Sequence, residues 1–209
     1  MFLRIGSVCA LAAILLAGGC RKEAESTGPE PSVHMDEAAL QKKVTALQKQ
    51  NTQLESRLNK LIPKQPYIVV NTTLNRIYVR KGEETLVDGP CSTGSNTELV
   101  APDGQRWFFS TPRGVFKVIR RRENPVWAMP NWGIVELELQ GEEVTSEDLF
   151  QRGVLGKYAL DLGHGYMIHG TLFQRFIGMS VTHGCIRVGD EDLQKIWDLT
   201  RLGTPVYIF

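Results

Sequence analysis

The segments MIHGT at residues 167–171 and VTHGCIR at residues 181–187 place a histidine and a cysteine next to glycines. A thiol attacks a carbonyl only as its thiolate, and a nearby imidazole can lower the thiol pKa and take the proton. Gly184 allows a tight backbone bend, which could aim successive N–H groups at a developing oxyanion. The pattern therefore predicts a cysteine acyl-transfer site in which Cys185 and His169 react together.

Together with three further motifs, these segments resemble the signature of the L,D-transpeptidase catalytic domain, a family that remodels bacterial peptidoglycan. The further motifs are STG at 92–94, TPRGVF at 111–116 and GTPVYI at 203–208. The resemblance runs from about residue 66 to residue 209. Two features depart from the family pattern: Thr182 stands where serine is more usual, and the histidine-to-cysteine loop is short, which could narrow a lid.

The resemblance implies a mainly β domain: an L,D-transpeptidase-type β-sandwich of mixed strands with one or two short helices. It implies Cys185 as the nucleophile and His169 as the base, with the carbonyl of Gly170 orienting the imidazole in place of an aspartate. The thiolate would attack a stem tetrapeptide of peptidoglycan, expel D-alanine and pass the acyl group to a neighbouring stem as a 3→3 cross-link. Water as acceptor would make the protein an L,D-carboxypeptidase, and a protein lysine would attach that protein to the wall.

The residues around the nucleophile have supporting roles in this interpretation. Thr182 and His183 would shape the pocket by hydrogen bonding, and the amides of Gly184 and Cys185 would form the oxyanion hole. Arg187 carries a permanent charge on a planar fork, which suits a carboxylate. That carboxylate could belong to the substrate, or to the protein as an ion pair that braces the loop, and the sequence leaves both interpretations open.

Two other function classes fit some of these residues. His164, His169 and His183 together with Cys185 allow a zinc site, but the spacing lacks the CxxC or HExxH patterns of zinc ligands. A catalytic pair with one structural histidine explains the same residues more simply, so we predict neither a metal nor a cofactor. A non-catalytic wall-binding scaffold is the other alternative, and an intact histidine–cysteine pair argues against it.

Composition and the N-terminus indicate an exported protein. The chain has 209 residues, 42% hydrophobic and 22% charged, which suits one globular domain with appendages, and its net charge of +1 gives no reason to expect nucleic acid as a partner. Arg4 precedes an apolar run at 5–17, too short to span a bilayer but typical of a signal peptide. The run ends in LLAGGC, which resembles a lipoprotein processing site, so residues 1–20 predict a signal peptide with Cys20 as a membrane lipid anchor in the cell envelope or periplasm.

Two segments separate this anchor from the catalytic domain at 66–209. Residues 21–35 are rich in polar residues and predict a flexible tether. Residues 36–62 carry a heptad seam, which predicts a coiled-coil helix. The seam consists of Leu40, Val44, Leu47, Asn51, Leu54, Leu58 and Leu61. It could form a homodimer or pack against the chain's own domain, and its narrowness favours the homodimer.

Within the domain, alternating and β-branched segments predict short strands, including one at 134–139, and the acidic start of 190–199 predicts a helix laid on a sheet. The aromatic, proline-rich segment 125–133 predicts an irregular loop that could wall a cleft, with Trp132 contacting substrate. The basic run at 120–122 predicts a solvated strand end. Cys91 is expected to be a buried strand residue rather than a disulfide partner of the nucleophile.

Overall fold

The computed structural model describes residues 36–209. The predicted signal peptide with its anchor at Cys20, and the predicted tether at 21–35, lie outside the described residues. Among the described residues, no helix combines the length and the apolar character needed to cross a bilayer.

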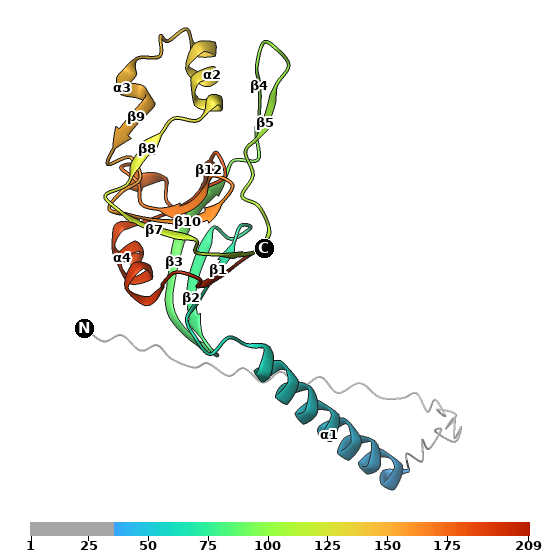
Figure 1. Ribbon diagram of the computed structural model, residues 1–209. Coiled ribbons are helices and arrows are strands. Elements are labelled where there is room, and N and C mark those ends of the chain that lie inside the picture. Colours follow the sequence, from blue (N-terminus) through green and yellow to red (C-terminus); the bar gives the residue numbers. More distant parts are fainter. Residues whose placement is uncertain (1–35) are drawn as a thin grey trace, which may run out of the picture. The chain divides into compact units, whose positions relative to one another are not determined.

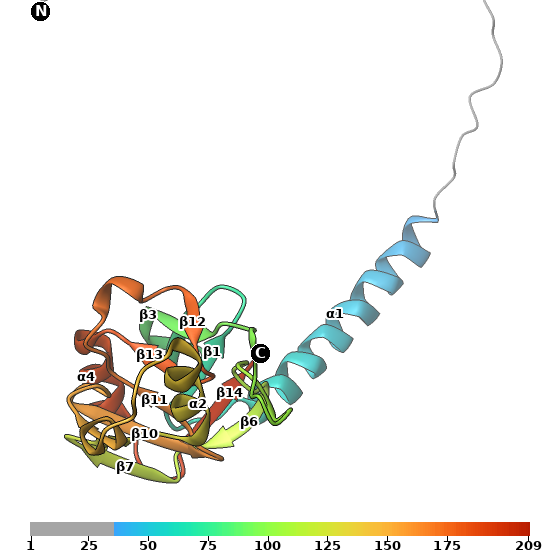
Figure 2. The same ribbon diagram turned by 90° about the horizontal axis from the view of Figure 1, so that it is seen from above.

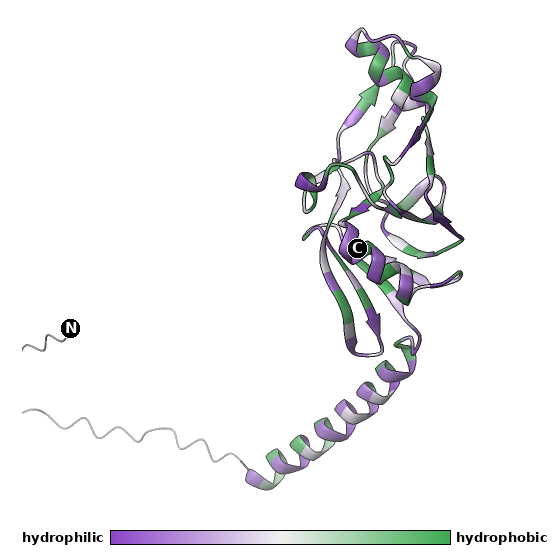
Figure 3. Ribbon diagram, turned by 90° about the vertical axis from the view of Figure 1, so that its left-hand side faces the viewer, coloured by the Kyte–Doolittle hydropathy of each residue, from purple (hydrophilic) through white to green (hydrophobic). Residues whose placement is uncertain are grey.

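Helix α1 (Glu37–Leu61) covers the segment predicted to form a coiled coil. Every residue of α1 from Glu37 to Leu61 is exposed, including the apolar residues of the heptad seam. Figure 3 shows hydrophobic positions recurring along a mainly hydrophilic helix. An exposed apolar stripe of this kind is a surface on which another helix could pack.

The remainder of the described chain is mainly β, as the sequence predicted, and is built around a curled mixed sheet (Figure 1). Its strands are β1 (Tyr67–Asn71), β2 (Arg76–Lys81), β3 (Glu84–Gly94), β6 (Gly114–Lys117), β7 (Arg120–Glu123), β10 (Tyr158–Gly163), β11 (Tyr166–His169), β12 (Ser180–Thr182), β13 (Ile186–Val188) and β14 (Pro205–Ile208). They pair in the order β6-β14-β1-β2-β3-β13-β11-β10-β7, and β12 also pairs with β3.

The long strand β3 joins the two parts of this sheet. Its first part pairs with β2 in an antiparallel hairpin, and its last residues pair with β13. At the same end, Thr93 and Gly94 pair with β12 in parallel. The STG motif at 92–94 is therefore the strand end on which both segments flanking the cysteine rest.

The core lies between the sheet and α4 (Asp190–Leu199), the helix predicted at the same residues. Alternate strand residues point into it, and the largest fully buried ones include Ile68, Ile77 and Leu160. Leu193 and Ile196 are the buried residues of α4, and Figure 3 shows hydrophobic segments in the strands beside it. Tyr158 stacks on Trp197 of α4 with ring centroids 4.3 Å apart.

Two small sheets and three short helical segments stand outside the main sheet. They are β4 (Glu98–Val100) with β5 (Arg106–Phe108), β8 (Val126–Ala128) with β9 (Phe150–Arg152), α2 (Asn131–Gln140), α3 (Ser146–Leu149) and the 3₁₀ turn Gln174–Phe176. Figures 1 and 2 show α2 lying over the part of the sheet formed by β10, β11 and β13.

The prediction of a strand at 134–139 is wrong, because these residues belong to α2. The segment alternates in hydrophobicity, but Glu and Leu are better helix formers than strand formers. Pro130 holds an extended conformation before the first turn, and Gly141 ends the helix in the left-handed conformation, where glycine is favoured. Consecutive residues of α2 are half-buried, whereas in a strand with one buried face every second residue would be buried.

Candidate active site

Strand register brings the predicted nucleophile and base to one face of the sheet. Strands β11 and β13 run in parallel, with Ile168 opposite Ile186 and His169 opposite Arg187. Both isoleucines are fully buried in the core. Because side chains alternate along a strand, His169, Arg187 and the preceding Cys185 face the other way. All three line one cleft of about 1050 Å³.

The His169 ring is oriented by the carbonyl that follows it. His169 is 4% exposed, and its Nδ1 lies 2.6 Å from the Gly170 oxygen. A carbonyl can only accept, so Nδ1 carries the proton and Nε2 of the neutral ring is the proton acceptor. Burial lowers the pKa of His169 to about 4, and the charges of Arg187 and Arg122 act in the same direction. The imidazole is therefore neutral at physiological pH.

The Cys185 thiol also rests in its neutral form. Burial raises its pKa to about 11, against the opposing effects of a backbone hydrogen bond from Met167 and the Arg187 charge. The sulfur donates to the carbonyl oxygen of Gly165 at 3.6 Å. The structure thus differs from the sequence expectation of a thiol pKa lowered by the imidazole: the resting pair is thiol and neutral imidazole.

Thr182 fixes the turn that carries the cysteine. Its hydroxyl accepts a hydrogen bond from the Gly184 amide at 3.1 Å and donates to the Cys185 carbonyl at 2.6 Å. This geometry corrects the prediction that the Gly184 amide serves an oxyanion hole, because that N–H is already bonded inside the turn. Of the two predicted donors, the Cys185 amide is the one that remains.

Arg187 is half-buried in the cleft. Burial lowers the pKa of its guanidinium, and a negative charge on the Cys185 sulfur acts in the opposite direction. Within residues 36–209, the ion pairs involve other cations, and none includes Arg187. Arg187 therefore has no acidic partner in the described part of the chain, and the ion pair that would brace the loop is not formed there.

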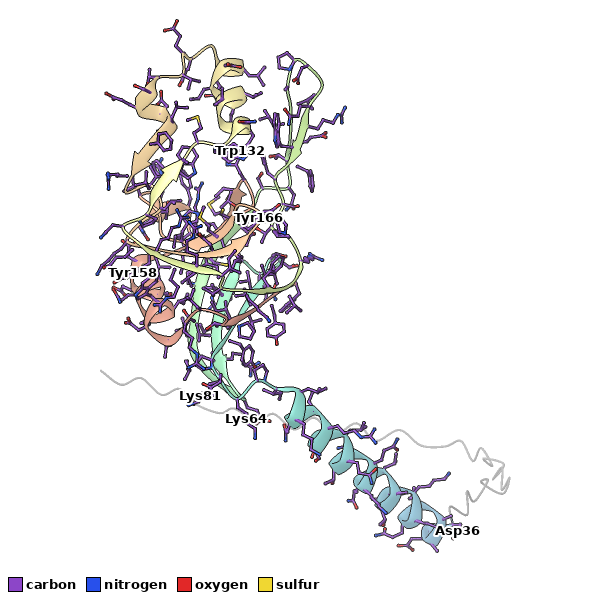
Figure 4. All side chains as sticks on the ribbon, in the orientation of Figure 1. Asp36, Lys64, Lys81, Trp132, Tyr158 and Tyr166 are labelled. Atoms are coloured by element: carbon purple, nitrogen blue, oxygen red, sulfur yellow. The ribbon has the colours of Figure 1, made fainter. Side chains whose placement is uncertain are left out.

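His183 and Trp132 form one wall of the cleft. Their rings stack with centroids 4.0 Å apart, and the His183 Nε2 lies 3.1 Å from a Glu136 carboxylate oxygen. Burial lowers the pKa of His183, and the Glu136 carboxylate opposes this effect. Figure 4 shows Trp132 on the side of α2 and Tyr166 below it, near the sheet. Trp132 thus lines the cleft, as expected, from the start of a helix and not from an irregular loop.

The basic run at 120–122 begins β7, and the prediction of a solvated strand end holds for Arg120 but not for the half-buried Arg121 and Arg122. Arg122 reaches Asp161 at 2.9 Å and lines the cleft, and Arg120 lies 3.6 Å from the same carboxylate. Arg121 points to the opposite face, where its guanidinium lies 3.8 Å from the Trp197 ring centroid. The period-2 alternation of β7 could have signalled this division, but the sequence does not reveal the two partners.

The remaining cysteine and histidine predictions concern metal and disulfide chemistry. Cys91 lies fully buried in β3 with its pKa raised to about 12 by burial, and both it and Cys185 are free thiols. His164 lines the cleft in a left-handed turn. Among residues 36–209, no three His, Cys, Asp or Glu side chains gather in a way that could hold a metal ion.

Comparison with known proteins adds to this geometry. The YkuD family model, described as the L,D-transpeptidase catalytic domain, matches residues 65–208. A probable L,D-transpeptidase of Escherichia coli, YbiS, is 32% identical over 148 residues, 69% of this chain and 47% of the relative. A probable L,D-transpeptidase of Salmonella typhimurium, ErfK/SrfK, is 33% identical over 153 residues, 71% of this chain and 48% of the relative. The chain thus spans about half the length of these relatives.

Solved structures show the same fold at low sequence identity. An L,D-transpeptidase from Xylanimonas cellulosilytica has a TM-score of 0.52 and 18% identity, covering 70% of this chain and 61% of that one. An Enterococcus faecium L,D-transpeptidase has a TM-score of 0.50 and 20% identity, covering 70% of this chain and 50% of that one.

Proposed function

We propose, from the premise that this chain belongs to the L,D-transpeptidase catalytic domain family, that it is a cysteine acyltransferase that forms 3→3 cross-links in peptidoglycan. The observation that supports this best is the shared face of β11 and β13, which presents Cys185, His169 and Arg187 to one cleft. Neither a metal nor a cofactor enters the proposal.

In the first half-reaction, Nε2 of His169 takes the Cys185 proton as the sulfur attacks the carbonyl of the third residue of a stem tetrapeptide. The carbon–nitrogen bond to D-alanine breaks, the leaving amine takes the proton from His169, and a thioester remains. Because burial keeps His169 neutral, the base is ready without prior deprotonation. Arg187, which has no acidic partner in residues 36–209, would hold a substrate carboxylate.

In the second half-reaction, the side-chain amine of a diamino acid on a neighbouring stem attacks the thioester. His169 accepts a proton from this amine, the carbon–sulfur bond breaks, and the sulfur regains its proton. Water in place of the amine would give a tripeptide, the product of an L,D-carboxypeptidase. A lysine of another protein would attach that protein to the wall. The three outcomes share one acyl-enzyme and differ in which acceptor reaches it.

The experiment is incubation of the protein with disaccharide-tetrapeptide, followed by mass spectrometry of protein and products. We expect a cross-linked dimer and a covalent carbapenem adduct at Cys185, both lost in Cys185→Ala with an unchanged circular dichroism spectrum. A tripeptide product would select the carboxypeptidase. Product formation that survives Cys185→Ala would contradict the mechanism, and a protein that binds wall fragments without any turnover would be the scaffold.

The membrane anchor is a second part of the proposal. A lipid on Cys20 would hold the enzyme in the cell envelope, where its substrate lies, and several acyl chains anchor a protein firmly. Labelled palmitate should enter the wild-type protein and should not enter Cys20→Ser. Equal labelling of both proteins would contradict the anchor.

Self-association through α1 is the third part. The seam residues Leu47 and Leu54 are exposed along a helix that buries none of its own residues, which favours pairing with a second copy. Leu47→Glu with Leu54→Glu should turn a dimer into a monomer in sedimentation, whereas Gln53→Glu, outside the seam, should not. A wild-type monomer at high protein concentration would contradict pairing.

A further inference from the structure

Thr111, the first residue of the TPRGVF motif, connects two distant parts of the site through one hydroxyl. The side chain is buried, and its Oγ1 accepts a hydrogen bond from the Gly94 amide at 2.8 Å. The same hydroxyl donates its proton to the Gly184 carbonyl at 2.9 Å. Thr111 therefore joins the end of β3 to the peptide unit immediately before the nucleophile.

The second of these bonds determines where an amide proton points. The Gly184 carbonyl and the Cys185 N–H belong to one planar trans peptide unit, so they point in opposite directions. With the carbonyl held by Thr111, the Cys185 N–H is directed away from Thr111. Thr182 holds the groups on either side, the Gly184 amide and the Cys185 carbonyl. Two threonine hydroxyls thus fix the backbone on both sides of the Cys185 α-carbon.

Both glycines are needed for this close approach. A Cβ on Gly94 would lie 2.5 Å from the Phe109 carbonyl oxygen and 2.6 Å from the Thr111 nitrogen. A Cβ on Gly184, whose φ is +120°, would lie 2.9 Å from the Ser110 oxygen and 2.7 Å from the Tyr166 ring. The backbone at 109–111 is therefore packed directly against both the β3 end and the cysteine turn.

We propose that Thr111 is a positioning residue that fixes the Gly184–Cys185 peptide so that the Cys185 N–H serves as the oxyanion donor. The inference rests on the proposed acyl transfer and adds a residue to it. Because the Gly184 amide is engaged by Thr182, correct aim of the Cys185 amide matters more than in a site with two free backbone donors. The hydroxyl acts through the backbone and does not touch the substrate.

The test compares two reactions of the same sulfur. Acylation by a carbapenem develops an oxyanion, whereas alkylation by iodoacetamide displaces iodide at a saturated carbon and develops none at an attacked carbonyl. Removing one oxyanion donor typically lowers a rate by about 10²–10³-fold. In Thr111→Val we therefore expect carbapenem acylation to fall at least about tenfold while alkylation of Cys185 stays within about threefold of wild type. Thr111→Ser, which keeps the hydroxyl, should restore acylation.

A matched control is Thr200→Val. Thr200 is also buried and donates its hydroxyl proton to a backbone carbonyl, that of Ile196 at 2.6 Å, in α4. This variant should lose stability while its ratio of acylation to alkylation stays at the wild-type value. If Thr111→Val does not fold, Thr111→Ala removes the same hydroxyl and adds no methyl group. The same fall in the ratio of acylation to alkylation is then expected of Thr111→Ala.

The outcomes separate this inference from the proposed function. Wild-type acylation with an unchanged ratio in Thr111→Val or Thr111→Ala overturns the role of Thr111 and leaves the acyl transfer intact. An equal loss of both reactions also overturns it, because it would mean that the sulfur itself has moved. A wild-type protein that alkylates at Cys185 but never acylates overturns the proposed function.

Discussion

The indole of Trp132 lies flat on the imidazole of His183, with the ring planes 12° apart. One turn further along α2, a carboxylate oxygen of Glu136 lies within hydrogen-bond distance of His183 Nε2, at 3.1 Å. Phe109 packs edge-on against both rings, at 4.3 Å from His183 and 5.5 Å from Trp132. Helix α2 is therefore joined to the cysteine turn by a stack and a hydrogen bond, two residues before the nucleophile.

Loss of the stack between Trp132 and His183 should destabilise the folded protein. Replacing a large, partly buried aromatic by alanine removes apolar contact, which we expect to lower the free energy of unfolding of Trp132→Ala by about 1–3 kcal/mol. Urea unfolding measures this change. Trp132→Phe keeps an aromatic face and should retain most of the stability. A Trp132→Ala midpoint equal to that of wild type would show that the stack contributes nothing.

The pH dependence of acylation should report a base with a low pKa. Only neutral His169 can accept the thiol proton, and burial lowers its pKa from 6.5 to about 4. The carbapenem acylation rate should therefore stay near its neutral value down to about pH 5 and fall around pH 4. A rate profile that instead drops near pH 6.5 would mean that His169 titrates as it does in water.

The same shift makes stability depend on pH. The His169 pKa is about 4 in the folded chain and 6.5 as the ordinary value, so between these pH values the unfolded chain binds more protons. Stability should thus fall as the pH drops from about 6.5 towards 4, by up to about 3 kcal/mol from this one residue. His169→Gln has no such proton to bind and should show a correspondingly flatter curve of unfolding free energy against pH. Parallel curves would contradict the assignment.

Arg187 should recognise a substrate carboxylate through its planar fork. We expect Arg187→Gln to raise KM for a tetrapeptide with a free terminal carboxylate by about tenfold or more, the usual scale of a charged hydrogen bond. Arg187→Lys should recover part of the loss, because it keeps the charge and lacks the fork. For a tetrapeptide amidated at its C-terminus, wild type and Arg187→Gln should differ little. An equal KM increase for both substrates would indicate a structural role.

Some of these features follow directly from the sequence. The residues of α4 are readable because Asp190, Glu191 and Asp192 occupy a first turn and the apolar residues repeat at helical spacing. The mainly β character and the family follow from short motifs in a fixed order. Such signals are local, so they do not depend on which distant segments come together.

Other features depend on distant contacts and were not predictable in this way. The alternating segment 134–139 is a different case, since its helix-forming Glu and Leu residues and its boundaries at Pro130 and Gly141 are local signals that outweigh the alternation. The pKa shifts of His169 and Cys185 arise from burial, which spacing cannot show. Thr111 meets Gly184 from 73 positions earlier in the chain, and no local pattern indicates that bond.

Strand β3 constrains how the chain could be lengthened or shortened. A residue inserted between Cys91 and Gly94 would turn the following side chains of β3 to the opposite face of the sheet. It would also shift the register of β3 with β12 and β13. Strands β8 and β9 pair only with each other, so the part of the connecting segment beyond Trp132 and Glu136 can change in size without shifting the register of the main sheet. An engineer who wishes to admit a bulkier acceptor would therefore rebuild the loop at 141–145 between α2 and α3, keep Trp132 and Glu136 against His183, and leave β3 unchanged.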